Sequence, residues 1–166
     1  SIGQSDHRYT PMQLCSYVAA VANKGTRYAA TFMKRVVSAD YRQRLAYNEP
    51  SVASTLEISD EAYTAVLEGM ELVASDPKGT AYSTFKNYPI PVCAKTGTAQ
   101  TGIPNTSSNG AFVCFAPKDD PQIAIAVYVE KGGHGSTLST IARSILQEYF
   151  NVGTVSDVTT HENQLS

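Results

Sequence analysis

The chain has no tryptophan, only three cysteines and only three histidines among its 166 residues. His7, His134 and His161 are too far apart in the sequence to predict a metal site. The cysteines, at positions 15, 93 and 114, are odd in number and lack metal-ligand spacing. We interpret them as small apolar core residues, and a disulfide between Cys93 and Cys114 stays open if their strands pair. Cysteine usage therefore does not indicate a redox compartment.

Long apolar runs and an excess of one charge are also missing. No stretch approaches the roughly 18 apolar residues that a membrane-spanning helix needs. The first residues, Ser-Ile-Gly-Gln, lack the charged start and apolar stretch of a signal peptide. No methionine begins the chain, so we expect it to continue from a longer protein. The net charge of −2 excludes a general attraction to nucleic acid or anionic membranes.

Three segments place apolar side chains at helical spacing, which predicts helices over residues 11–24, 60–75 and 138–150. Thr10 can cap the first helix, and Gln13 completes a capping box with it. Ser59 can cap the second helix. These signals predict one buried face on each helix.

Other segments read as extended, because β-branched and aromatic residues dominate them. We expect extended stretches over residues 28–37 and 44–47 and strands over residues 92–98, 111–116 and 123–129. The last two strands form a hairpin through the turn-rich residues 117–121, and Ala124 and Ala126 share a face that a helix can approach closely. The predicted fold class is α+β, an antiparallel sheet flanked by helices, over residues 1–151, followed by a polar tail over residues 152–166.

One short motif carries chemistry. Residues 95–98 read Lys-Thr-Gly-Thr at the end of a predicted strand. Lys-Thr-Gly is a signature element of penicillin-binding proteins and serine β-lactamases, and here a strand precedes it while a long loop, an apolar hairpin and a helix follow. Four further segments resemble class B penicillin-binding proteins: Gly-Gln at 3–4 with Tyr-Thr-Pro-Met-Gln-Leu at 9–14, Gly-Thr-Ala at 79–81, residues 111–117 and residues 129–135. The chain thus resembles the C-terminal part of their transpeptidase domain.

The resemblance implies a role for each residue of the motif. Lys95 supplies positive potential, and the hydroxyls of Thr96 and Thr98 hydrogen-bond the substrate carboxylate in charge-assisted bonds. Gly97 has no side chain, so the acyl substrate can lie along the strand edge as an added strand. The Thr98 backbone N–H is expected to be one of two oxyanion-hole donors.

The implied activity is that of a peptidoglycan D,D-transpeptidase, in which a serine takes the acyl group of a stem peptide ending in D-Ala-D-Ala and passes it to an amine. β-Lactams acylate the same serine. The expected partners are the stem peptide, β-lactam antibiotics and the N-terminal part of the same domain, with no nucleic acid, cofactor or metal. The resemblance also implies an extracytoplasmic, membrane-anchored protein, although this chain shows no anchor.

The nucleophile itself is expected upstream, because the letter matches in this chain fail on context. Residues 83–86 fit Ser-x-x-Lys, but Pro89 and Pro91 follow closely and argue against a helix there. Residues 75–78 contain a proline inside the match. Residues 107–109 fit Ser-x-Asn but follow the Lys-Thr-Gly motif instead of preceding it.

Two further features weigh less. The glycine-rich residues 132–136 lack the lysine placement of a phosphate-binding loop, so we interpret them as a tight turn before the last helix. Relatives commonly begin the final hairpin with tryptophan and phenylalanine, whereas this chain has Ala111 and Phe112.

Three alternatives stay open. A serine β-lactamase or a β-lactam sensor shares the motif and the sheet, and fast release of the acyl group would indicate the former. A non-catalytic binding or scaffolding domain could keep the strand without the nucleophile. The chain could also be one half of a nicked protein, which an exposed apolar face would favour.

Overall fold

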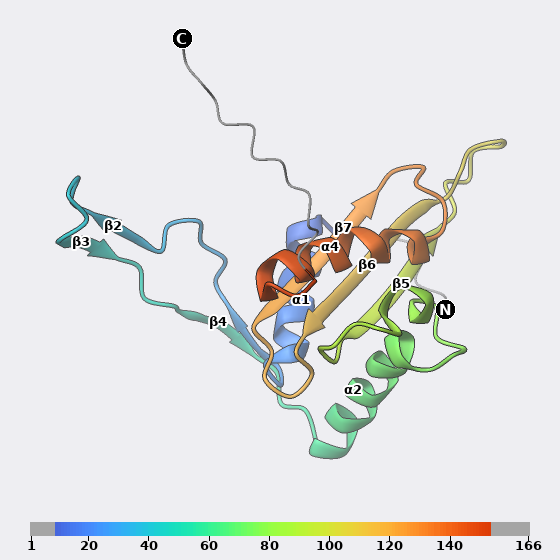
Figure 1. The fold of residues 1–166 in the computed structure, drawn as a ribbon, viewed down its shortest axis with the longest axis horizontal. Coiled ribbons are helices and arrows are strands. Elements are labelled where there is room, and N and C mark those ends of the chain that lie inside the picture. The colour runs from blue at the N-terminus through green and yellow to red at the C-terminus, as the bar shows by residue number, and fades with distance from the viewer. Residues whose placement is uncertain (1–8, 154–166) are drawn as a thin grey trace, which may run out of the picture.

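The structure, a computed structural model, describes residues 9–153 (Figure 1). Its helices are α1 (Pro11–Ala22), α2 (Asp60–Ser75), α3 (Tyr82–Phe85), the 3-10 helix Gly135–Leu138 and α4 (Ser139–Phe150). Its strands are β1 (Thr26–Tyr28), β2 (Arg35–Val37), β3 (Arg44–Tyr47), β4 (Val52–Thr55), β5 (Cys93–Ala99), β6 (Asn109–Ala116) and β7 (Ile123–Val129). None of the helices in residues 9–153 combines the length and apolarity that crossing a membrane requires.

The central element is an antiparallel sheet in the order β5-β6-β7. Cys93 pairs with Phe115 and Thr98 with Gly110 along β5 and β6, and β7 forms a hairpin with β6. In this order β5 has no strand on its outer side within the described residues. The backbone groups of that edge are therefore open to another chain or a ligand.

Helices cover both faces of this sheet, as Figure 1 shows. On one face, α1 and α2 pack over Phe115 and Cys93, and Val18 of α1 lies in the same buried cluster. On the other face, α4 and α3 pack over Phe112 and Cys114. Since successive residues of a strand point to opposite faces, the same strands supply both cores.

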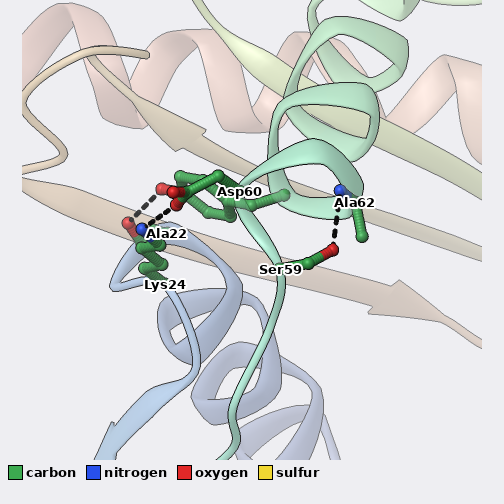
Figure 2. A network of polar contacts seen from close by, with 6 residues as sticks. Ala22, Lys24, Ser59, Asp60 and Ala62 are labelled. Atoms are coloured by element: carbon green, nitrogen blue, oxygen red, sulfur yellow. Dashed lines mark hydrogen bonds and ion pairs between the residues drawn. The ribbon is translucent and has the colours of Figure 1, made fainter.

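Local signals place the helices as expected. The Thr10 hydroxyl accepts from the Gln13 N–H, and the Gln13 side chain accepts from the Thr10 N–H, which completes the predicted capping box. The Ser59 hydroxyl accepts from the Ala62 N–H at 3.2 Å (Figure 2). Helix α1 ends at Ala22, two residues earlier than predicted, because Lys24 and Gly25 both take positive φ angles.

Between α1 and α2 the chain forms an arm, residues 26–57, that extends away from the sheet (Figure 1). Its base is the antiparallel pair β1–β4, and its tip is the antiparallel hairpin β2–β3. No residue of the arm is buried, and neither core cluster includes one. The arm is therefore held by its own backbone pairing and by its base.

Polar contacts close that base, where α1 ends and α2 begins. Lys24 forms an ion pair with Asp60, as Figure 2 shows. The Tyr63 hydroxyl donates to the Ala22 carbonyl at 3.1 Å, and the Leu56 N–H donates to the Gly25 carbonyl at 3.0 Å. These contacts hold the two ends of the arm side by side.

The structure excludes the disulfide that the sequence left open, and it corrects two details of the predicted strands. The disulfide does not form: all three cysteines are free, and Cys93 and Cys114 point to opposite faces because Cys93 pairs with Phe115 and Cys114 with Ala94. The stretch 28–37 is not one strand: it contains the last residue of β1 and all of β2, separated by a bend. Strand β4 was not predicted.

The short helix α3 corrects the expectation that residues 83–86 leave no room for helix. It spans only four residues and ends before the prolines, so proline limits the helix without preventing its first turn. The segment Gly3-Gln4, the histidines His7 and His161 and most of the predicted tail lie outside the described residues.

Candidate functional site

Strand β5 carries all four residues of the Lys-Thr-Gly-Thr motif, Lys95 to Thr98, on the open edge of the sheet. Thr96 and Thr98 point toward the α4 face, together with Phe112 opposite Thr96. Lys95 and Gly97 point to the other face. The motif therefore presents hydroxyl groups on one face of the edge strand and a cationic side chain on the other.

The lysine lies against its own strand. Lys95 is exposed, and its Nζ donates to the Thr96 carbonyl at 2.7 Å. This contact brings the ammonium group toward the threonine residues although its side chain starts on the opposite face. An ammonium group held near hydroxyl donors is suited to binding a carboxylate.

Sequence reasoning did not assign a role to Thr80, which the structure places beside the motif. The hydroxyl oxygens of Thr80 and Thr96 lie 3.0 Å apart, and one donates to the other. Thr80 follows Gly79, where a Cβ atom would lie 2.3 Å from the Leu72 carbonyl oxygen. The Gly-Thr-Ala segment, noticed in the sequence only as a resemblance, therefore packs tightly against α2 and supports the Thr96 hydroxyl.

The glycine-rich turn after β7 also contacts the motif. The Gly135 N–H donates to the Thr98 hydroxyl oxygen at 3.1 Å. A Cβ atom on Gly135 would lie 2.1 Å from the Gly97 carbonyl oxygen and 2.3 Å from that of Ala111. Only glycine fits this contact, so the segment interpreted as a simple turn also fixes the end of β5.

Beneath the site, the sheet is held by buried apolar groups. Burial raises the pKa of the Cys93 thiol from 9.0 to about 12, and burial does the same for Cys114. Both thiols are therefore neutral and poor nucleophiles near pH 7.

Away from these buried thiols, Lys118 forms a half-buried ion pair with Glu71 at 2.6 Å, and this hydrogen bond raises the pKa of Lys118.

The serine matches dismissed in the sequence occupy ordinary structural positions. Ser83 is exposed in α3, and Lys86 is exposed just after that helix. Asn109 begins β6, where its side-chain oxygen accepts from the Lys131 N–H at 2.9 Å, as expected for a loop entering a strand. Within residues 9–153, no group of three or more histidine, cysteine, aspartate or glutamate side chains could hold a metal ion.

Helices lie on both faces of an antiparallel sheet with Lys-Thr-Gly-Thr on its open edge strand, the arrangement that the resemblance to penicillin-binding proteins implies. Residues 1–148 match the family model for the penicillin-binding protein transpeptidase domain. The chain belongs to this family.

Relatives agree with this assignment. The chain is 33% identical to penicillin-binding protein 2B of Streptococcus pneumoniae over 90% of this chain and 23% of that protein. It is 28% identical to the peptidoglycan D,D-transpeptidase MrdA of Escherichia coli over 87% of this chain and 25% of that protein. The solved structure of penicillin-binding protein 2B from S. pneumoniae strain R6 covers 88% of this chain at 27% identity, with a TM-score of 0.72. The chain spans about a quarter of the length of these relatives.

Proposed function

We propose that this chain is the substrate-docking part of a peptidoglycan D,D-transpeptidase that β-lactams acylate. The observation that carries the proposal is the motif on the open edge of β5. There the Lys95 ammonium group donates to the Thr96 carbonyl, and the hydroxyls of Thr96 and Thr98 lie on one face of the strand. The family supports the reaction class, and the name of the E. coli relative supports peptidoglycan as the substrate. The protein is expected to act outside the cytoplasm, where that polymer lies.

In this proposal the stem peptide pairs with the edge of β5 as an added strand, and Gly97 leaves room for it. Lys95 and the hydroxyls of Thr96 and Thr98 bind its carboxylate. The Thr98 N–H stabilises the oxyanion that forms when a serine outside this chain attacks the penultimate D-Ala carbonyl. The attack releases D-Ala, and an amine of a second stem peptide then accepts the acyl group.

In this scheme the direction of the hydrogen bond between the Thr80 and Thr96 hydroxyls matters for substrate binding. A hydroxyl donates one hydrogen bond and accepts others. If Thr80 donates to Thr96, the single O–H of Thr96 remains available to the substrate carboxylate. Thr80 is thus a positioning residue that selects the useful orientation of the Thr96 hydroxyl.

An apolar groove supports the proposal that another part of the same polypeptide completes the domain. The groove, about 850 Å³, runs between α1 and the base of the arm. Met12, Tyr17 and Leu56 line it and are 51%, 65% and 66% exposed. Large apolar side chains grouped in this way are typical of surfaces that a further layer covers. The N-terminal part of the transpeptidase domain is the occupant we expect.

The test is the rate of acylation of the full-length protein by benzylpenicillin, followed by intact mass. Lys95→Ala should slow acylation about 10- to 100-fold, because it removes a charge-assisted contact with the substrate carboxylate. Lys86→Ala is the matched control, because it removes an exposed lysine of the dismissed serine motif. Equal rates for Lys95→Ala and the unsubstituted protein would overturn the docking role.

A further inference from the structure

The arm carries an excess of positive charge in a chain that is otherwise acidic. Residues 26–57 contain five basic and three acidic residues, a net charge of +2, whereas the whole chain carries −2. Arg42 forms an ion pair with Asp40, and Arg27 donates to the Ser54 hydroxyl. Lys34, Arg35 and Arg44 form no ion pair within the described residues.

The unpaired arginines share one face of the β2–β3 hairpin with a tyrosine. Arg35 lies directly opposite Tyr47 in the register, and the guanidinium carbon of Arg44 lies 5.1 Å from the centre of the Tyr47 ring. A bulge between Val36 and Val37 shifts the register so that these groups meet. We call Arg35, Arg44 and Tyr47 the Arg–Tyr face. The stacked guanidinium is held in place while its N–H groups stay open to an acceptor.

The outer part of the arm exposes two large aromatic side chains and depends on a hairpin with little stability of its own. A two-stranded hairpin is only marginally stable in water by itself. Phe32, between β1 and β2, is 99% exposed, and Tyr41 at the hairpin turn is 85% exposed. Meanwhile the base is clamped by the Lys24–Asp60 pair (Figure 2), so the arm is directed outward from the domain (Figure 1).

We propose that the Arg–Tyr face binds the glycan strands of peptidoglycan through the carboxylates of their stem peptides, and this rests on the function proposed above. Guanidinium groups bind carboxylates through paired, charge-assisted hydrogen bonds. Tyrosine offers a flat apolar ring with a polar tip, which suits the C–H faces and hydroxyls of sugars. The charge of the two arginines and the ring of Tyr47 thus favour a polymer that carries both carboxylates and sugars over a purely apolar partner. The arm holds the polymer while one stem peptide docks on β5.

The experiment is sedimentation of the full-length protein with purified insoluble peptidoglycan at low salt. Arg35→Ala with Arg44→Ala should weaken binding at least about tenfold, because it removes two charge-assisted contacts. Lys78→Ala with Lys86→Ala is the matched control, since it removes the same charge from exposed positions outside the arm. Arg35→Lys with Arg44→Lys keeps the charge but loses the planar fork, and we expect an intermediate loss.

Three results would overturn the proposal. The first is equal sedimentation of the arginine-to-alanine variant and the unsubstituted protein. The second is equal binding to peptidoglycan whose carboxylates have been converted to methylamides. The third is arm-dependent binding to vesicles of phosphatidylglycerol but not to peptidoglycan, which would assign the face to lipid. Benzylpenicillin acylation, measured on every variant, should be unchanged, so a failure of the proposed function is detected separately.

Discussion

The sheet buries its phenylalanine side chains, whereas the arm exposes its single phenylalanine. Phe112 in β6 is fully buried between helices, whereas Phe32 in the arm is 99% exposed. Around β5, tertiary contacts hold both backbone and side chains: Gly135 packs on Gly97, and the Thr80 hydroxyl contacts that of Thr96. In the arm, only pairing between strands and the clamped base fix the chain. Tertiary contacts therefore fix the strand that carries the motif, whereas the arm makes few contacts with the rest of the chain.

The strongest test of this contrast compares two phenylalanines. Phe112→Ala should lower the free energy of unfolding of the transpeptidase domain by about 3–5 kcal/mol, because it leaves a cavity between sheet and helices. Phe32→Ala should change it by less than about 0.5 kcal/mol, as exposed sites usually do. Denaturant unfolding measures both, and equal losses would show that the arm packs on the rest of the domain.

Alkaline pH should destabilise the sheet through its buried thiols. The pKa of each thiol is about 12 in the folded chain and near 9.0 when unfolded. The unfolded state therefore loses protons first as pH rises above 9, and stability falls from there toward pH 12 by at most about 4 kcal/mol per thiol. Unfolding between pH 8 and 10 measures the start of this fall. Cys114→Ala should reduce the slope, and an unchanged slope would refute the assignment to Cys114.

Closer to the substrate, Thr80→Val should slow benzylpenicillin acylation about 3- to 10-fold, the worth of one neutral hydrogen bond. Valine keeps the shape of threonine but cannot orient the Thr96 hydroxyl. Thr80→Ser keeps the hydroxyl and should acylate nearly as fast as the unsubstituted protein. Acylation of Thr80→Val at the rate of the unsubstituted protein would contradict the positioning role.

The smallest expected effect concerns the junction between the two regions. Ser59→Ala removes the cap of α2, where the hydroxyl accepts from the Ala62 N–H (Figure 2). It should lower the free energy of unfolding by about 1 kcal/mol. Peptidoglycan binding should not change, because the Lys24–Asp60 pair still closes the base. Loss of binding would mean that the cap also sets the direction of the arm.

The sequence predicted the buried elements and, in the arm, β3, but it missed the rest of the arm's pairing. The bounds of α2 and β7 were predicted without error, because their apolar spacing and, for α2, the Ser59 cap are local signals. Strand β4 was missed, since Val52 to Thr55 is exposed and has no apolar alternation. The register that places Cys93 and Cys114 on opposite faces depends on strand pairing, which the sequence does not specify locally.

The candidate site was predicted in part for the same reason. The motif Lys95 to Thr98 is contiguous, so its position on one strand follows directly from the sequence. Thr80 and Gly135 reach it from 16 and 37 residues away, by contacts that only the folded chain brings together. The Gly-Thr-Ala segment was the signal for Thr80, and the signals for Gly135 were the glycine-rich turn and the resemblance over residues 129–135.

The central claim is that this chain supplies the docking strand to a serine located elsewhere in the polypeptide. Its most direct test is to treat the full-length protein with benzylpenicillin and to map the adduct by proteolysis and mass spectrometry. The account predicts one adduct, on a serine outside these 166 residues, which forms more slowly in Lys95→Ala. An adduct on Ser83 would contradict it, because the chain would then carry its own nucleophile.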